Sequence, residues 1–185
     1  MKRSIKLFGL LALGAAVAAC DVTPEEENEE ELITTLRITF TETGTSNTVS
    51  AVFQDLDGDG GDAATLTNPT FAANTTYSAT IEVLNESETP AEDITAEVEE
   101  EGAEHQFFFE LSSGTGITTE YTDDDGSGNP VGLSFNLTTT DAGTGTMIVT
   151  LRHEPNKSAS GVSGGDITNA GGETDIEVTF DVTVQ

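Results

Sequence analysis

Hydrophobic and polar residues alternate along most of this 185-residue chain from residue 32 onward. Thr, Val, Ile and Phe are frequent in the alternating runs, while Gly, Asn and Asp separate one run from the next. A period of two residues is typical of β-strands that bury one face. The eight runs predict an all-β fold, an Ig-like antiparallel β-sandwich of about eight strands. Their inward residues are Leu36, Ile38 and Phe40; Val49, Ala51 and Phe53; Tyr77, Ala79, Ile81 and Val83; Phe107, Phe109 and Leu111; Ile117, Thr119 and Tyr121; Val131, Leu133, Phe135 and Leu137; Met147, Val149 and Leu151; and Ile176, Val178, Phe180, Val182 and Val184.

One short helix is expected among the strands. Thr89, Pro90 and Glu92 have the spacing of an N-cap, a first helical residue and the third residue of a capping box, and Gly102 stands where a left-handed residue ends a helix. The last turn carries acids at positions 99–101, which the helix dipole disfavours at a C-terminus. A bound cation or plain solvent would relieve that conflict.

The N-terminus predicts a lipoprotein signal. Lys2, Arg3 and Lys6 precede an apolar run at 7–19 that is too short to span a bilayer, and the run ends at Cys20. Residues 1–19 are therefore expected to be removed and Cys20 to carry a lipid that anchors the protein to a membrane. Residues 20–31 would form an acidic tether and residues 32–185 the β-sandwich. The alternative is an ordinary secretory signal in which Cys20 is incidental.

The charge of the chain narrows the range of partners. After removal of the signal, three basic residues stand against 34 acidic ones, a net charge of −31 with neutral histidines. Such a field repels nucleic acid and attracts cations, although acidity also simply keeps a surface protein soluble. Because Cys20 is the only cysteine, no disulfide forms within the chain, and stability must come from the core or from bound ions.

The two histidines are candidates for a metal site. His105 shares a strand face with Phe107, and His153 shares one with Leu151, so both are predicted to point inward at the rim of the sandwich. Alternating strand directions, with short hairpins such as 112–116, place both at one end of the domain. Two imidazoles with carboxylates suit Zn²⁺ or another transition metal, although the spacing is no recognised zinc signature. The alternative is that each histidine bonds a carbonyl or carboxylate at the rim. The carboxylates expected at that end are Glu104, Glu154, Glu173 and Asp175.

Two acidic loops partly match calcium-binding loops, in which carboxylate oxygens wrap a cation around a glycine turn. Neither has the glutamate expected at the twelfth position, where Leu66 and Ser134 stand instead. Asp and Gly also form ordinary turns without an ion. If Ca²⁺ binds, it would make a long loop rigid. The candidate ligands are Asp55, Asp57, Asp59 and Asp62 in the first loop, and Asp123, Asp125 and Ser127 in the second.

Catalytic motifs are missing from the sequence. There is no serine elbow, no Walker loop and no activated cysteine, and the many carboxylates single out no acid and base pair. The sequence therefore predicts a binding or structural protein and not an enzyme.

Several segments together resemble a family of Bacteroidetes lipoproteins often labelled type 1 periplasmic binding fold superfamily proteins. They are the lipobox, the acidic tether, "DLDGDGG", "ANTTY", "EEEGAEHQFFFE", "GNPVGL", "LRHEPNK" and "AGGETDIEVTF", and they cover essentially the whole mature chain. The label implies a two-lobed α/β structure. The strand pattern predicts a β-sandwich instead, and we expect the β-sandwich. The tether also resembles surface-export signals of such lipoproteins.

The resemblance implies an accessory to a TonB-dependent outer-membrane transporter with a metal as cargo. His105 and His153 stand in "EHQ" and "RHEP", where a ligand site of the family would map. The expected function is therefore a lipid-anchored protein of the outer membrane, on its cell-surface or periplasmic face, that binds a metal ion or small ligand. The alternative is a calcium-stabilised structural or adhesive surface module without cargo.

Overall fold

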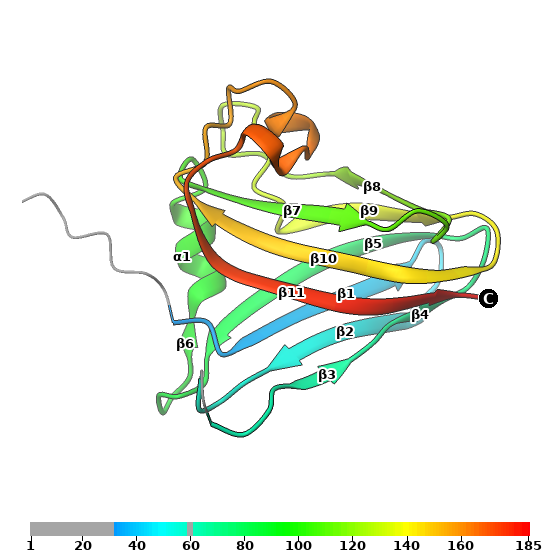
Figure 1. Ribbon diagram of the computed structural model, residues 1–185, viewed down its shortest axis with the longest axis horizontal. Helices are drawn as coiled ribbons and strands as arrows, with labels where there is room; N and C mark the ends of the chain where they lie inside the picture. Colours follow the sequence, from blue (N-terminus) through cyan, green and yellow to red (C-terminus); the bar gives the residue numbers. More distant parts are fainter. Residues whose placement is uncertain (1–31, 59–60) are drawn as a thin grey trace, which may run out of the picture.

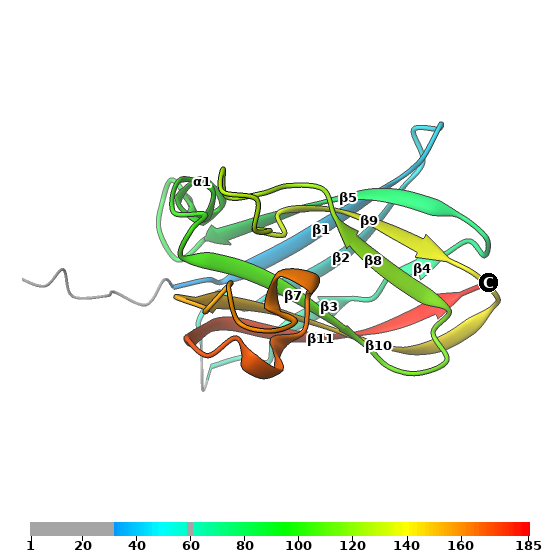
Figure 2. The ribbon, with the colours of Figure 1, turned by 90° about the horizontal axis from the view of Figure 1, so that it is seen from above.

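A computed structural model describes residues 32–58 and 61–185 as two β-sheets packed face to face, with one α-helix at one end (Figure 1, Figure 2). The predicted signal and tether, Cys20 and Asp59 lie outside the described residues. The all-β prediction is confirmed, and the two-lobed α/β fold implied by the family label is not the fold of this chain.

The larger sheet has the strand order β3-β2-β1-β5-β9-β8, and the short strand β6 pairs with β5. All neighbouring strands in it are antiparallel. Its strands are β1 (Thr35–Glu42), β2 (Thr48–Gln54), β3 (Thr65–Thr67), β5 (Thr76–Asn85), β6 (Glu92–Asp93), β8 (Ile117–Tyr121) and β9 (Ser134–Thr139).

The smaller sheet has the strand order β4-β11-β10-β7. β10 is antiparallel to both of its neighbours, and β4 runs parallel to β11. Its strands are β4 (Thr70–Phe71), β7 (His105–Leu111), β10 (Gly143–His153) and β11 (Glu173–Val184).

Each of the eight predicted runs contains a strand, and three short strands, β3, β4 and β6, were not predicted. They have two or three residues each, too few for an alternating pattern to be visible. The hairpin expected at 112–116 is wrong, because β7 and β8 lie in different sheets and the segment crosses between them. Strand direction still alternates, since crossing between two packed sheets reverses the chain as a hairpin does.

The core lies between the inward faces of the two sheets. One buried cluster contains residues of both, and aromatic rings join them. The ring of Phe40 meets those of Phe71 and Phe135 edge-on, with centroids 4.9 Å and 6.0 Å apart. The ring centroid of Phe109, from the smaller sheet, lies 4.1 Å from that of Phe135 in the larger sheet. Such contacts add to the free energy gained from apolar burial.

The helix α1 (Ile94–Glu100) begins later than predicted. Glu92 and Asp93 do not form the first turn. They form the short strand β6 instead, because their backbone groups pair with those of Asn85 and Leu84 on β5. The expected left-handed conformation of Gly102 is also wrong. A Cβ at that position would lie 3.0 Å from Val131 Cγ2, so the glycine permits close packing. Within residues 32–58 and 61–185, no helix is long and apolar enough to cross a bilayer.

The long segment 155–172 packs on the outer face of β7 in the smaller sheet. It contains two 3₁₀ turns, Val162–Gly164 and Ile167–Asn169, and lies at the same end of the sandwich as α1 (Figure 1). Val162 and Ala170 pack on Phe108, which faces away from the main core. Gln106 donates a hydrogen bond from Nε2 to the Val162 carbonyl at 2.8 Å. Both faces of β7 are therefore buried near its first residue, His105.

Gly132 provides a test of the packing between the sheets. It has φ +87°, and a Cβ there would lie 2.9 Å from Phe107 Cβ and 3.0 Å from Tyr121 Cε1. Backbone strain and overpacking should together make Gly132→Ala lower the free energy of unfolding by about 3 kcal/mol. Gly128→Ala, at φ +91° with open space, should cost about 1 kcal/mol. Urea unfolding measures both variants, and equal losses would contradict the packing described here.

Candidate metal centre

The register of the smaller sheet brings the two histidines together. His105 on β7 is the direct cross-strand partner of His153 on β10. Their imidazole rings are stacked, with centroids 4.6 Å apart and planes 17° from parallel. Both side chains are buried, as the alternation predicted. The two histidines are thus close enough to share one ion.

A β-bulge adds Asp175 to the pair. Leu151 pairs with Ile176, but Arg152 pairs with Thr174, so Asp175 is the extra residue on β11. Plain alternation from the buried Ile176 would turn Asp175 to the outside. Bulges redirect side chains, and here the Asp175 side chain is only 1% exposed, with Oδ2 3.8 Å from Nε2 of His105. His105, His153 and Asp175 each offer a ligand atom within 4.8 Å of the others, and we name these three residues the inner group.

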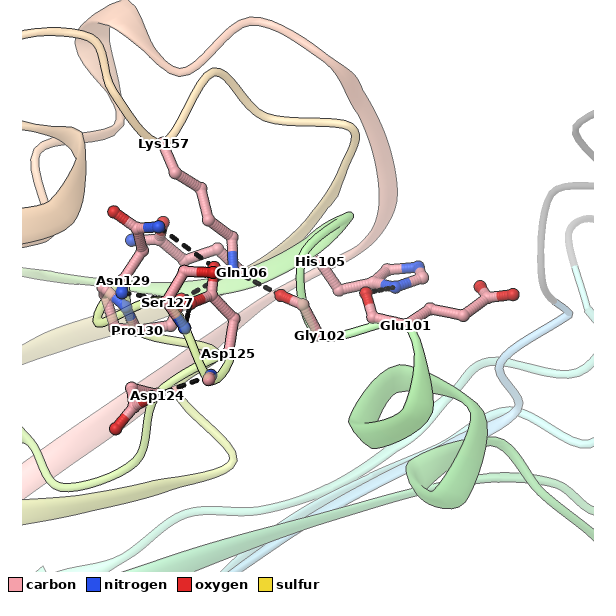
Figure 3. A network of polar contacts seen from close by, with 12 residues as sticks. Glu101, Gly102, His105, Gln106, Asp124, Asp125, Ser127, Asn129, Pro130 and Lys157 are labelled. Atoms are coloured by element: carbon pink, nitrogen blue, oxygen red, sulfur yellow. Dashed lines mark hydrogen bonds and ion pairs between the residues drawn. The ribbon is translucent and has the colours of Figure 1, made fainter.

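The end of α1 sets the tautomer of His105. Its Nδ1 lies 3.3 Å from the carbonyl oxygen of Glu101 (Figure 3). Because a carbonyl only accepts, Nδ1 carries the proton and Nε2 presents its lone pair toward Asp175. Burial lowers the pKa of His105 to about 4, with repulsion from His153 and Lys157 acting in the same direction. His105 is therefore a neutral imidazole at physiological pH, the form that coordinates metals.

Two glutamates form a second group with His153 at the surface. Glu104 Oε2 lies 4.0 Å from Nε2 of His153, and its side chain is 59% exposed. The backbone N–H of Glu154 donates to the Glu104 carbonyl at 2.6 Å. Glu104, His153 and Glu154 also offer ligand atoms within 4.8 Å of one another, and we name them the outer group. Glu173 lies opposite His153 in the ladder but belongs to neither group.

The inner group has the donor atoms of a transition-metal site, but the lone pairs of its two imidazoles do not point to a common centre. Two imidazole nitrogens and a carboxylate suit Zn²⁺, Co²⁺ or Cu²⁺ better than the oxygen-seeking Ca²⁺. A ring nitrogen binds a metal in the ring plane at about 2.0–2.1 Å. The lone pairs of two nearly parallel rings do not meet at one point, so one ring must turn when an ion binds. His153 is the more exposed of the two, at 7% against 0% for His105, so we take it as the ring that turns.

The acidic loop after β8 surrounds a lysine (Figure 3). Lys157 is buried, and its ammonium donates to the carbonyls of Gly102 and Pro130 and lies 3.6 Å from Asp125 Oδ2. Asp125 also accepts from the backbone N–H groups of Ser127 and Asn129 at 2.9 Å and 3.1 Å. Lys157 was not among the residues predicted to have a role. The available signal was its rarity, because Arg37, Arg152 and Lys157 are the only cationic residues after Cys20 apart from the histidines.

Lys157 also lies beside the acidic last turn of α1, where the helix dipole disfavours negative charge. Its ammonium bonds the carbonyl of Gly102, directly beyond the acidic last turn, so a cation from the chain itself meets the negative end of the helix dipole. Burial lowers the pKa of Lys157, and the Asp125 carboxylate opposes that shift. For Asp125, burial acts to raise the pKa, but hydrogen bonds from Asn129 and Ser127, together with Lys157, lower it to about 2. The Asp125 carboxylate is therefore ionised at neutral pH.

The predicted calcium ligands of the second loop are engaged in the loop itself. Asp123 accepts from the N–H groups of Gly132 and Ser134 at 2.8 Å and 2.9 Å. Asp125 bonds as described above, and Ser127 is exposed. Such bonds make the ordered turn that was the alternative to a calcium site. Calcium binding here stays a prediction.

The first acidic loop is described only in part, because Asp59 lies outside the described residues. Asp55 accepts from the N–H of Gly58 at 3.0 Å, and Asp57 accepts from the N–H of Asp62 at 2.8 Å. Among the residues that the structure describes, no predicted calcium ligand of either loop belongs to a group of three metal-binding side chains. Calcium binding at this loop also stays a prediction.

Comparison with known proteins adds no relative to this picture. No family model, no curated protein and no solved structure matches the chain.

The neutral state of His105 predicts how stability depends on pH. Its pKa is about 4 in the folded metal-free protein and near 6.5 when unfolded, so between these values the unfolded chain binds more protons. The free energy of unfolding should therefore fall by about 3 kcal/mol as the pH is lowered from 6.5 to 4. Urea unfolding at a series of pH values measures this slope, and His105→Gln should reduce it. An unchanged slope in that variant would contradict the assignment.

The buried ion pair predicts a second stability effect. Lys157→Met leaves the Asp125 carboxylate and two carbonyls without the ammonium, which should lower the free energy of unfolding by about 3 kcal/mol. Arg37→Met is the matched control, because Arg37 pairs with Glu82 at the surface, where both side chains are about half exposed. The control should cost less than about 1 kcal/mol. Equal losses in the two variants would show that Lys157 does not hold this end together.

Proposed function

We propose that this protein binds a divalent transition-metal ion, of which Zn²⁺ is the first candidate, through His105, His153 and Asp175. The observation that carries the proposal is the convergence of two imidazoles and a redirected carboxylate within 4.8 Å of one another. The sequence separates these residues by 48 and 22 positions. Three strands of the smaller sheet bring them to one place.

The chemistry of the donors supports a cation at this place. The hydrogen bond to Glu101 makes Nε2 of His105 an acceptor, and the facing oxygen of Asp175 is an acceptor as well. A cation between two acceptors is stabilised by both, and imidazole nitrogen favours transition metals over Ca²⁺ or Mg²⁺. The bond from Nδ1 of His105 to a carbonyl is also the partner that metal-binding histidines commonly have.

Three protein ligands leave a fourth position of a tetrahedral zinc ion open. Open positions are typical of sites that exchange water, substrate or a second ligand, whereas structural zinc sites are closed. A water molecule or a ligand from a partner protein would complete the coordination at that position. Because the sequence contains no catalytic motif, we propose a binding protein and not an enzyme.

The cellular setting of the proposal comes from the sequence. The lipobox and acidic tether support a protein that is anchored through Cys20 to the outer membrane. The family resemblance supports a TonB-dependent transporter as the partner that receives the ion. In this setting the metal end of the sandwich would face the partner, while the net negative charge attracts cations from the surroundings.

Titration calorimetry of the purified protein with Zn²⁺, Co²⁺, Cu²⁺ and Ca²⁺ tests the proposal. One transition-metal ion should bind per chain with a Kd of about 1 μM or lower, a free energy of about −8 kcal/mol. His105→Gln, His153→Gln and Asp175→Asn should each weaken binding at least about 100-fold, or about 3 kcal/mol. Saturation at 100 times Kd should also stabilise the fold by about 2.7 kcal/mol.

Glu173→Gln is the matched control for Asp175→Asn. Each removes one negative charge from β11 at the same end of the domain, but Glu173 is exposed and lies outside both groups. The control should bind the metal as the wild type does. Stabilisation by Ca²⁺ alone, with indifference to all three ligand variants, would overturn the proposal in favour of the calcium-stabilised surface module.

A further inference from the structure

His153 belongs to both groups of potential ligands. We infer that the outer group of Glu104, His153 and Glu154 captures the divalent ion first, and that a turn of the His153 ring passes it to the inner group. This inference rests on the proposed function and adds the route by which the ion reaches the site. Its basis is the shared imidazole, the gradient of exposure and the stacking of the two rings.

Exposure decreases step by step from the outer group to the inner one. The Glu104 side chain is 59% exposed and that of His153 is 9% exposed, whereas His105 and Asp175 are exposed by 0% and 1%. An ion coming from solvent therefore meets the glutamates first and His153 next. His105 and Asp175 have almost no side-chain surface in contact with solvent.

The ring of His153 offers a ligand atom to the inner group and to the outer group. It lies over His105 with planes 17° from parallel, and in this position its Nε2 is 4.0 Å from Glu104. An in-plane lone pair reaches one group at a time. Turning the ring exchanges Glu104 and Glu154 for His105 and Asp175 as the other ligands, so a single side-chain rotation moves the ion inward.

The backbone holds the outer carboxylates beside the ring. The N–H of Glu154 donates to the carbonyl of Glu104 at 2.6 Å, which ties the end of β10 to the residue before β7. Two carboxylates around one imidazole attract a hydrated cation and raise the rate at which it arrives. They are too exposed to hold the ion as firmly as the buried donors, because water screens their charges.

Stopped-flow mixing of Zn²⁺ with the protein and a chromophoric zinc indicator tests the route. In the double variant Glu104→Gln, Glu154→Gln, the association and dissociation rates should both fall about tenfold, while Kd stays within about threefold of wild type. The matched control is Glu99→Gln, Glu100→Gln, which removes the same charge from exposed positions at the end of α1. The control should slow association less than about twofold.

The variant His105→Gln distinguishes Zn²⁺ binding to the outer group from binding to the inner group at equilibrium. It breaks the inner group and leaves the outer one, so weak, fast Zn²⁺ binding should remain and should disappear when Glu104→Gln and Glu154→Gln are added. Circular dichroism checks that each variant is folded. A second readout is the ring-current shift of the His105 and His153 proton resonances, which should be lost when Zn²⁺ binds and the rings unstack.

The possible outcomes distinguish this inference from the proposed function. Tight Zn²⁺ binding in which the double variant matches the control in rate overturns the route alone. A Kd raised about 100-fold in the double variant makes Glu104 and Glu154 direct ligands and also overturns it. If the wild type binds Zn²⁺ only weakly, through the outer group, the proposed function fails and the route to the inner group fails with it. If no Zn²⁺ binds at all, both fail.

Discussion

The ladder that β10 forms with β7 on one side and β11 on the other is the interaction on which the rest of this structure depends. β10 is one of the two central strands of the smaller sheet, and its inward residues fill the core opposite the larger sheet. The same register that buries Met147, Val149 and Leu151 places His153 against His105 at the rim. A slip of one residue would turn all of these side chains to the other face. The position of the candidate metal centre is therefore specified by the packing of the core.

A chain with so many acids and so few cations uses each cation at a definite place. Lys157 is buried at the junction of α1, the loop after β8 and the segment 155–172, where it bonds two carbonyls and Asp125. Its charge stabilises the acidic helix end and contributes to keeping His105 neutral. The domain has no disulfides, and Lys157 links the loop after β8 to the segment 155–172 through Pro130 and Asp125. Bound calcium was expected to make such a loop rigid. The same end of the sandwich carries both groups of potential metal ligands.

The bulge on β11 shows how a small irregularity creates a site. Regular pairing would leave Asp175 on the outer face and the two histidines as a stacked pair at the rim. One extra residue turns a carboxylate inward beside them, which changes the chemistry from an aromatic contact to a mixed nitrogen and oxygen donor set. Glu173, two residues earlier, stays exposed. Backbone register thus decides which acid of this strand, Asp175 or Glu173, lies beside the two histidines.

Hydrophobic alternation in the sequence was enough to predict the class of the fold, its eight long strands and the inward direction of His105 and His153. Burial of alternate residues leaves a period of two in any half-buried strand. The sequence also placed the histidines at one end of the domain. It did not show that they are cross-strand partners, that Asp175 and not Glu173 joins them, or that α1 begins at Ile94. Those features depend on which strands pair, where a ladder is interrupted and which backbone groups find partners. The role of Lys157 likewise required three segments distant in sequence to enclose one ammonium group, and only tertiary packing decides such contacts.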